Sequence, residues 1–381
     1  MTVTDETSPV RQVSLPDGRT IWQVRRYELV RELLTSGELS NDTSAMGDRA
    51  PLAGLPEFVR GLVERGMLNN DPPAHTRKRS AVAQHFTSRR AKAARSAVRR
   101  IAGELVDAFA GEPVVDLFTA YTTPLPTRVL GEIIGIPAAD CRRVQQLSDV
   151  FVTDLLSSSE RQELAGTELL TYYAELGRQR RKTPAADVIT DLVGAGMGDD
   201  DDISSMVFVV MLAGQTAATQ LLTKGLWSLL THERQFAGLR ADRSLLSSTV
   251  DECLRYQTPL ALSAFRSPLH RPYVVAGVEI PAGDVVVCSL AEANRDPDRF
   301  ADPDAFDVRR EDNQHLAFGY GLHRCLGAHL AKVEAEVAFE TLMDRFDDIR
   351  LTGATDVVWD QTALMRRIVA LPVRLSTNDS E

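Results

Sequence analysis

An uncharged stretch in the middle of the chain places the strongest constraint on the fold. No side chain from Ser204 up to Lys224 carries a charge, and we expect a helix from about Ser204 to Leu230. A helix without a polar face must be covered on most of its surface. Its most apolar part, Met206 to Ala213, is followed at once by GQTAATQ and is too short to cross a bilayer. The stretch therefore predicts a helix buried inside a large protein core.

Further helices are predicted before this stretch. Apolar residues recur at steps of three and four in residues 90–111, 140–156 and 160–182, which is the spacing of one buried helix face. Four aspartates, Asp199 to Asp202, precede the uncharged stretch. We interpret them as a solvated loop in which Asp201 or Asp202 caps the next helix, because a carboxylate accepts hydrogen bonds from unpaired amides there. A metal site is the less favoured alternative.

Strands are predicted near both ends of the chain. Residues 11–24, RQVSLPDGRTIWQV, alternate around a Pro-Asp-Gly turn and predict a hairpin. Residues 271–290 and 357–375 also contain short β-branched runs separated by turn residues. Residues 294–314 are rich in Asp, Pro and Arg and predict an ordered meander. With no repeat or linker in sight, we expect a mainly α (α+β) fold in one large helical domain, residues 1–381, with small β-sheets.

Charge, the N-terminus and the cysteines exclude several classes of protein. A formal net charge of −10 argues against nucleic-acid binding. The N-terminal residues, MTVTDETSPV, contain neither a basic nor an apolar signal-peptide region, so we expect a cytoplasmic protein without a membrane partner. The four cysteines lie far apart and form no CxxC pair, which predicts neither a zinc site nor a disulfide framework.

One cysteine, Cys325, lies inside a frame of glycines, in HLAFGYGLHRCLGAHL. The apolar residues that follow it are spaced as on one helix face, so the cysteine lies at or just before a helix N-terminus. The helix dipole and unpaired amides favour a thiolate there. Gly319 and Gly321 let the loop lie flat, and Gly327 allows close approach of the helix. A thiolate beside a flat clearance is what an axial ligand of haem iron requires.

Residues 318–327, FGYGLHRCLG, resemble the haem-ligand signature of the cytochromes P450. The resemblance extends over nearly the whole chain. DECLRYQTP, residues 251–259, resembles the Glu-x-x-Arg segment of the family, with Glu252 and Arg255 as the pair and Arg310 of the meander as the third member of an ion network. NNDPPAHTRKR, residues 69–79, resembles the bacterial segment that faces a haem propionate. A surface helix pair is the alternative for Glu252 and Arg255, and a buried inert thiol is the alternative for Cys325.

The resemblance implies haem b between the uncharged helix, which would be the oxygen-activating helix, and the cysteine loop. Cys325 would be the iron ligand, with Phe318 and Gly327 beside the cofactor. Two buried propionate carboxylates need donors. The residues implied as those donors are His75, Arg79, Arg266 and His323.

The oxygen-activating segment departs from the family. MLAGQTAATQ resembles its Ala-Gly-x-acid-Thr segment, which places Thr216 at the acid position and Ala217 at the threonine position. That pair ordinarily relays protons, and such assistance is typically worth about 10² to 10⁴ in rate. The competing explanations are a relay water held by Thr216 or Gln215, a substrate with its own polar group, and a reaction that tolerates poor proton relay. We favour a substrate that supplies its own polar group. In the plainest alternative, the alanines only make room for the substrate, and a chain of water molecules relays the protons.

The resemblance also implies the substrate pocket. It would be lined by residues 52–67, by helices from about Cys141 to Arg181, and by residues 213–217, 260–264 and 362–365. These stretches are mostly apolar, which favours a medium-sized hydrophobic small molecule, possibly bound to a carrier. The individual candidates are Leu212, Ala213, Leu262, Ser263, Leu364 and Met365.

The function that we expect is oxidation with O2, by hydroxylation or oxidative coupling, in bacterial secondary metabolism. The chain contains no GxGxxG fingerprint and no cysteine cluster, so electrons would come from ferredoxin and ferredoxin reductase. Nine Arg and Lys residues and no acid lie between Pro72 and Gly103, and we expect this basic face to dock the ferredoxin, with a merely solvated helix face as the alternative. A peroxide-driven peroxygenase, an inert accessory protein and a gas or redox sensor are the rival functions.

Overall fold

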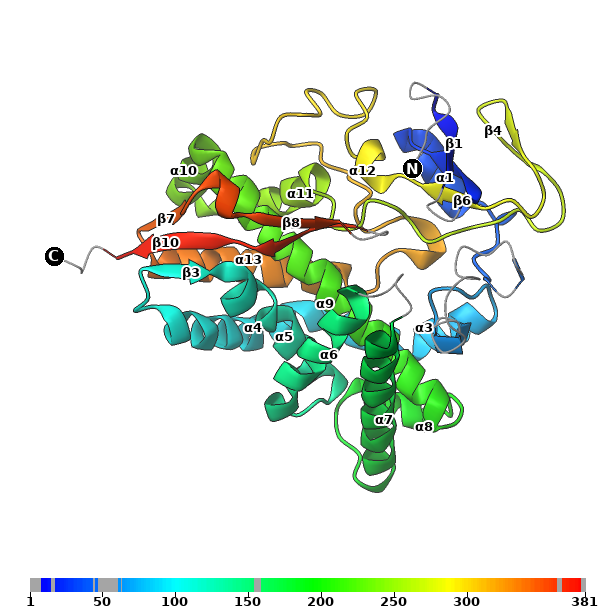
Figure 1. The fold of residues 1–381 in the computed structure, drawn as a ribbon, viewed down its shortest axis with the longest axis horizontal. Helices are drawn as coiled ribbons and strands as arrows, with labels where there is room; N and C mark the ends of the chain where they lie inside the picture. Colours follow the sequence, from blue (N-terminus) through cyan, green and yellow to red (C-terminus); the bar gives the residue numbers. More distant parts are fainter. Residues whose placement is uncertain are drawn as a thin grey trace.

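The computed structural model describes residues 8–14, 18–43, 45–46, 61–62, 64–153, 159–361 and 365–377. Its helices account for most of the regular structure (Figure 1). They are α1 (Tyr27–Thr35), α3 (Ala74–Ala83), α4 (Ser88–Phe109), α5 (Pro124–Ile134), α6 (Cys141–Thr153), α7 (Glu160–Lys182), α8 (Val188–Gly194), α9 (Asp200–Thr231), α10 (Glu233–Ala241), α11 (Leu246–Tyr256), α12 (Leu290–Ala293) and α13 (Ala328–Arg345). The mainly α prediction is confirmed.

The strands form small sheets around the helical core. They are β1 (Val10–Ser14), β2 (Thr20–Val24), β3 (Val114–Asp116), β4 (Tyr273–Val275), β5 (Val278–Ile280), β6 (Val286–Cys288), β7 (Asp348–Leu351), β8 (Val358–Gln361), β9 (Arg366–Ala370) and β10 (Pro372–Ser376). The sheets have the orders β1-β2-β6 and β3-β10-β7, together with the pairs β4-β5 and β8-β9. The predicted N-terminal hairpin is confirmed, since β1 pairs antiparallel with β2 from Val10↔Val24 to Ser14↔Thr20.

Helix α9 lies at the centre of the molecule and runs between α8 and α10 in Figure 1. It packs against α5, α7, α11 and α13. By length and composition it could cross a membrane, but 67% of its most apolar window is buried inside the protein. The helix is therefore buried by other helices, as its uncharged stretch predicts.

The start of α9 differs from the prediction. The N-cap is Asp199, whose side chain accepts a hydrogen bond from the amide of Asp202, so neither Asp201 nor Asp202 is the cap. The prediction was wrong because every one of the four carboxylates is chemically able to cap. The helix begins earlier than its apolar stretch, and Asp200 pairs instead with Arg178 and Arg181 of α7.

Besides a small group around Val13 and Ile21, two large groups of buried side chains divide the interior. The larger one joins the helices α4 to α11 and α13 with the sheet β3-β10-β7. The smaller one lies under β1, β2, α1 and the strands β4 to β6, on the upper right of Figure 1. The cysteine loop packs against α1, next to the smaller group. A single domain over residues 1–381 stays a prediction.

Candidate active site

The loop that carries Cys325 is a tight turn before α13. The amide of Gly319 donates to the carbonyl of Leu316, and the amide of Cys325 donates to the carbonyl of Phe318, both at 2.8 Å. Gly321 has a φ of +74°, and a Cβ there would lie 2.8 Å from the carbonyl oxygen of Leu34. Backbone conformation and close contact with α1 therefore both require glycine at position 321.

Gly327 is the N-cap of α13, and its amide donates a hydrogen bond to the sulfur of Cys325. No atom of the described residues lies within 4 Å of a Cβ built on Gly327, so no contact among them requires a glycine here. Close approach of the helix to a cofactor at this glycine stays a prediction.

Cys325 is an exposed residue, whereas Cys141, Cys253 and Cys288 are buried. Protein atoms surround its sulfur closely, and this burial raises the pKa of the Cys325 thiol. The Gly327 amide, Arg79 and Arg324 oppose that rise without overcoming it. The helix terminus alone therefore does not produce the expected thiolate. A bound cation is what makes a coordinating thiol lose its proton.

His75, Arg79, Arg266 and His323 form a cluster beside the cysteine loop, which we call the cationic cluster. The rings of His75 and His323 lie 4.1 Å apart, and Nη2 of Arg79 donates to the carbonyl of Arg324 at 2.7 Å. Burial, then the neighbouring His75 and Arg266, lowers the pKa of His323 to about 4. Burial followed by Arg79 lowers the pKa of His75.

The cationic cluster lacks anionic partners within the described part of the chain. Neither arginine makes an ion pair, and Nδ1 of His75 and Nε of Arg266 are buried without a hydrogen-bond partner. Asp71 is the nearby carboxylate, and it accepts hydrogen bonds from Ser40 and Asn41. Buried donors without acceptors are costly. Two carboxylates of a bound group would satisfy them, so the residues present fit a haem with its propionates.

One face of α9 is open although the helix lies in the core. Ala213 is exposed, and Leu212, Thr216 and Ala217 are half-buried, a spacing that places them on one face. On the opposite side Gly214 contacts α5, because a Cβ there would lie 2.7 Å from Cδ1 of Leu130. The open face therefore consists of small side chains and one hydroxyl.

The remaining polar residues of this segment face the interior. Gln215 and Thr219 are buried, and their side-chain oxygens have no hydrogen-bond partner among the described residues. Gln215 therefore lies away from the open face that carries Thr216 and Ala217. Of the three predicted catalytic positions, the structure brings only these two together on that face.

The loop of residues 260–264 is held by a side-chain hydroxyl. Ser263 Oγ donates to the carbonyl of Ala264 and accepts from the amide of Cys288, so this hydroxyl fixes the loop. Leu262 packs against the small apolar group that includes Val13 and Ile21. Ala264 is exposed. The predicted pocket residues Leu262 and Ser263 thus support the loop.

Part of the predicted pocket cannot be described. Met365 is buried, whereas Leu364 and the rest of residues 362–364 lie outside the described residues. The same holds for residues 47–60 and 154–158, which include most of the predicted stretch 52–67 and the link between α6 and α7.

Gln220 is a residue that the sequence analysis missed. Its amide donates to the carbonyl of Ile368 at 3.1 Å and accepts from the amide of Ile368 at 2.9 Å. These two bonds tie β9 to α9. An amide inside an otherwise apolar helix was the available signal, because buried polar groups are nearly always hydrogen-bonded.

Glu252, Arg255 and Arg310 meet as the resemblance implies. Both carboxylate oxygens of Glu252 accept from Arg255 at 2.8 Å, and Arg310 Nε lies 3.2 Å from Oε2. The Glu252 and Arg255 side chains are 0% exposed. Arg255 also donates to carbonyls of the meander, at Pro303 and Ala305. Glu252 and Arg255 are therefore not a surface pair, and together they hold the meander in place.

Only part of the basic segment between Pro72 and Gly103 is free of ion pairs with the described residues. Arg95 and Arg99 pair with Glu336 and Glu340 of α13, and Arg100 pairs with Glu104 and Glu132, so folding neutralises its C-terminal half. The half-buried Lys78 donates to Asn70 at 2.6 Å. Four exposed residues have no ion pair within the described ranges, and we call them the exposed basic face: Arg77, Arg89, Arg90 and Lys92.

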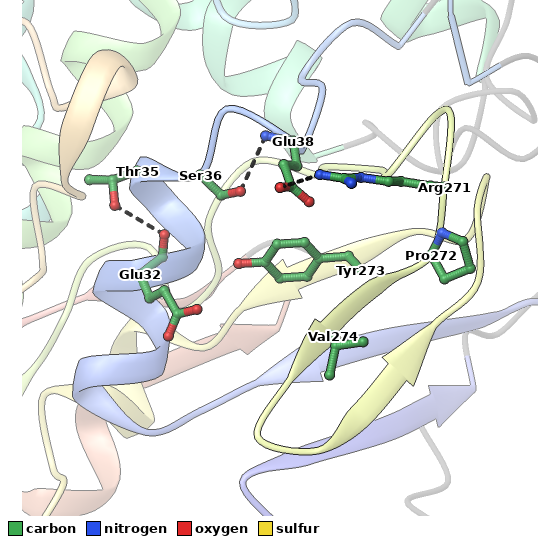
Figure 2. Close-up of a pocket in the computed structure, with 8 residues that line it drawn as sticks. All are labelled: Glu32, Thr35, Ser36, Glu38, Arg271, Pro272, Tyr273 and Val274. Carbon is green, nitrogen blue, oxygen red and sulfur yellow. Dashed lines mark hydrogen bonds and ion pairs between the residues drawn. The ribbon is translucent and has the colours of Figure 1, made fainter.

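A separate groove of about 600 Å³ lies between α1 and β4 (Figure 2). Arg271 pairs with Glu38 at 2.7 Å across it, and Thr35 bonds the carbonyl of Glu32 on α1. It is open and polar, and neither Cys325 nor the open face of α9 lines it. This groove is therefore not the candidate active site.

Comparisons with known proteins agree with this geometry. The sequence model described as Cytochrome P450 matches residues 187–354. The chain is 35% identical to the cytochrome P450 monooxygenase PikC of Streptomyces venezuelae over 96% of this chain and 88% of that protein. It is also 35% identical to the 6-deoxyerythronolide B hydroxylase of Saccharopolyspora erythraea, over 97% of this chain and 94% of that one.

A solved structure extends the comparison to the fold. P450BioI, in complex with an acyl carrier protein ligated to hexadec-9Z-enoic acid, superposes with a TM-score of 0.88 at 26% identity. The match covers 97% of this chain and 95% of that one. The arrangement of helices and small sheets is therefore the same in both proteins.

Proposed function

The chain belongs to the cytochrome P450 family, and from this premise we propose that it oxidises a medium-sized hydrophobic small molecule with O2. It is an oxidoreductase of the P450 monooxygenase type in natural-product biosynthesis. The proposed reaction is hydroxylation or oxidative coupling, in the cytoplasm and without a nucleic-acid or membrane partner. The observation that carries the proposal is an accessible cysteine beside a buried cationic cluster without anions.

Haem b is the form of the cofactor that we propose. Cys325 would ligate the iron, and Phe318 would lie beside the ring. Arg79 and Arg266 would neutralise the propionates, and His75 and His323 would donate hydrogen bonds to them. When bound, haem supplies O2 activation, which a thiolate ligand favours. The chain's own contribution is a fixed sulfur, held by the Gly327 amide, and a set of buried donors that are already in place.

Proton delivery is the step for which the chain provides least. The open face of α9 carries Thr216 as its polar side chain, and Ala217 stands where a second hydroxyl would be expected. Gln215 and Thr219 are buried on other faces. We therefore propose that a polar group of the substrate takes part in bringing protons to the site. A peroxide-driven reaction is the second candidate, since it would need less of this relay.

The substrate class follows from the residues around the open face. Leu212, Ala213 and Ala264 are apolar, and small side chains leave room for a bulky molecule. The carrier-protein complex of P450BioI supports a carrier-bound substrate as one form of it. Met365, and Leu364 outside the described residues, are further candidates for contact.

Ferredoxin, reduced by a ferredoxin reductase, is the proposed electron donor. The exposed basic face lies on α3 and α4, and α4 packs along α13 next to the cysteine loop. Arg79, on the same helix as Arg77, contacts that loop directly. An acidic donor would be steered to this face by its charge.

The test is the spectrum of the ferrous–carbon monoxide complex, with Cys325→Ser as the variant. We expect the thiolate-type band in the wild type and its loss, with loss of oxidation activity, in Cys325→Ser. Cys141→Ser, at a buried cysteine of α6, is the matched control and should keep both. A Cys325→Ser protein that retains the band would refute the proposed ligand. A wild type with the band but no turnover of any ligand would favour an accessory protein.

A further inference from the structure

Lys224 is a buried amine that the proposed oxidation does not use. It lies on α9 and is 4% exposed. Its one hydrogen bond to the described residues runs from Nζ to the carbonyl of Thr258 at 3.4 Å. An ammonium has three donors, so two remain without a partner among the described residues. A buried charge is tolerated where something pairs with it.

No described carboxylate is placed to pair with Lys224. Glu292 is near, but its oxygens are engaged by Arg11 at 2.9 Å and Arg25 at 2.6 Å. Arg295 pairs with Asp304 at 2.6 Å. Burial, and then the charge of Arg366, lowers the pKa of Lys224 to about 8. Folding thus brings two cations, Lys224 and Arg366, together without an anion between them.

Both cations line a half-open pocket of about 270 Å³ between α9, α11, α12 and the β8-β9 pair. At about 30 Å³ for each water, this is room for roughly nine water molecules, more than a bare ion needs. Two aromatic residues, Trp359 and Tyr256, line it as well. Arg366 stacks over Trp359 at 4.2 Å and Arg295 over Tyr256 at 4.0 Å, so each aromatic ring already lies beside a cation.

We propose that this pocket binds a small organic carboxylate, with its carboxylate on Lys224 and Arg366 and its apolar part against Trp359 and Tyr256. The two cations supply the charge that an acid would neutralise, and the volume and rings supply the surface for a hydrocarbon or aromatic body. A carboxylate there would accept the hydrogen bonds that the Lys224 ammonium cannot make to the protein.

The pocket adjoins two segments that belong to the predicted substrate pocket. Thr258 and Ala261 line it, and the chain continues directly into the loop that holds Leu262 and Ala264. Arg366 follows Met365 in the same way. The acid is therefore bound where it contacts the supports of that site, and neither Thr216 nor Ala217 lines the pocket.

Benzoate is the probe, titrated calorimetrically into the haem-loaded enzyme at constant ionic strength. The measurement is repeated at pH 6 and pH 8 in buffers of different ionisation enthalpy, which counts the protons taken up on binding. At pH 8 about half of the free Lys224 amines are neutral, so binding should take up about half a proton, and close to none at pH 6. The arginines keep their charge at both values.

Two variants test the assignment. Lys224→Met should weaken benzoate binding by at least about tenfold and abolish the proton uptake at pH 8. Arg366→Gln, at an exposed residue that is tolerant of change, should weaken binding but keep the uptake. Lys92→Met removes an exposed lysine without an ion pair and should change neither quantity. If Lys224→Met does not fold, the affinity of Arg366→Gln for benzoate still tests the proposal.

Several results would overturn the proposal. Binding of millimolar benzoate in the haem cavity instead would shift the Soret band and survive Lys224→Met. Absence of any binding heat, or equal proton uptake in wild type and Lys224→Met, would also reject it. If sulfate binds as tightly as benzoate and this binding depends on Lys224, the pocket is a site for bare anions. That result would refute the proposal that it binds an organic acid.

Discussion

Replacing Gln220 with Leu tests how β9 is held against the core. Trp359 of β8 and Ile368 of β9 are paired residues, and both backbone groups of Ile368 bond to the Gln220 amide. They therefore point away from β8, as in a non-hydrogen-bonded antiparallel pair. Leu is similar in size to Gln but leaves both groups without a partner. Ile368 is 0% exposed, so water does not replace the lost bonds.

The loss of stability follows from these two groups. An unsatisfied buried donor or acceptor costs about 1–3 kcal/mol, so the pair costs about 2–6 kcal/mol. For 381 residues the entropy of unfolding is about 0.8 kcal/mol per kelvin near the midpoint. The change should therefore lower Tm by roughly 3 to 8 °C.

Scanning calorimetry of the haem-loaded variants measures the shift, and hydrogen exchange of the peptide containing Ile368 locates it. Thr219→Val is the matched control on the neighbouring position. It removes a buried hydroxyl that has no partner in the described structure, so Tm should stay or rise slightly. A Tm for Gln220→Leu within 1 °C of the wild type, with unchanged exchange at Ile368, would refute this account of the strand.

Three further changes test other parts of the molecule. Thr216→Ala should cost little coupling of NADH to product with the native substrate, whereas an analogue without the polar group near the iron should release peroxide; equal coupling with both would contradict substrate-assisted proton delivery. Charge reversal at Arg89 and Arg90 should slow the first electron transfer from ferredoxin at low salt and reduce its salt dependence, while reversal at Arg161 on α7 should not. Glu334 is buried and makes no ion pair with the described residues, and burial raises its pKa to about 8. The folded protein thus binds the extra proton, so stability falls as the pH rises from 4.5 to 8; chemical unfolding should show this fall in the wild type and a smaller one in Glu334→Gln, and identical pH profiles would count against it.

Local signals in the sequence were enough for the elements and for the centre of the site. The uncharged stretch predicted the buried α9, and the alternating run near the N-terminus predicted β1 and β2, because periodicity reports directly which face is covered. The motif around Cys325 predicted the turn before α13. The same reasoning could not choose Asp199 as the N-cap, since four adjacent aspartates offer the same chemistry.

The charges show what the sequence alone could not decide. Nine basic residues formed a single basic stretch in the sequence, yet the fold brings Arg95 and Arg99 against acids of α13, more than two hundred residues later in the chain. Lys224 looked like the end of an apolar helix, and only the positions of Arg366 and Thr258 show that it lies unpaired in a pocket.

The sequence by itself determined the family, the helical core, the cysteine and the residues of the cationic cluster, because each is carried by neighbouring residues in a short segment. The tertiary structure decided which charges are neutralised, that Gln220 anchors β9, and that Gln215 is turned away from Thr216. The physical reason is that pairing and burial depend on contacts between distant segments, and a given Arg, Gln or Lys has many partners of suitable chemistry until the fold selects one.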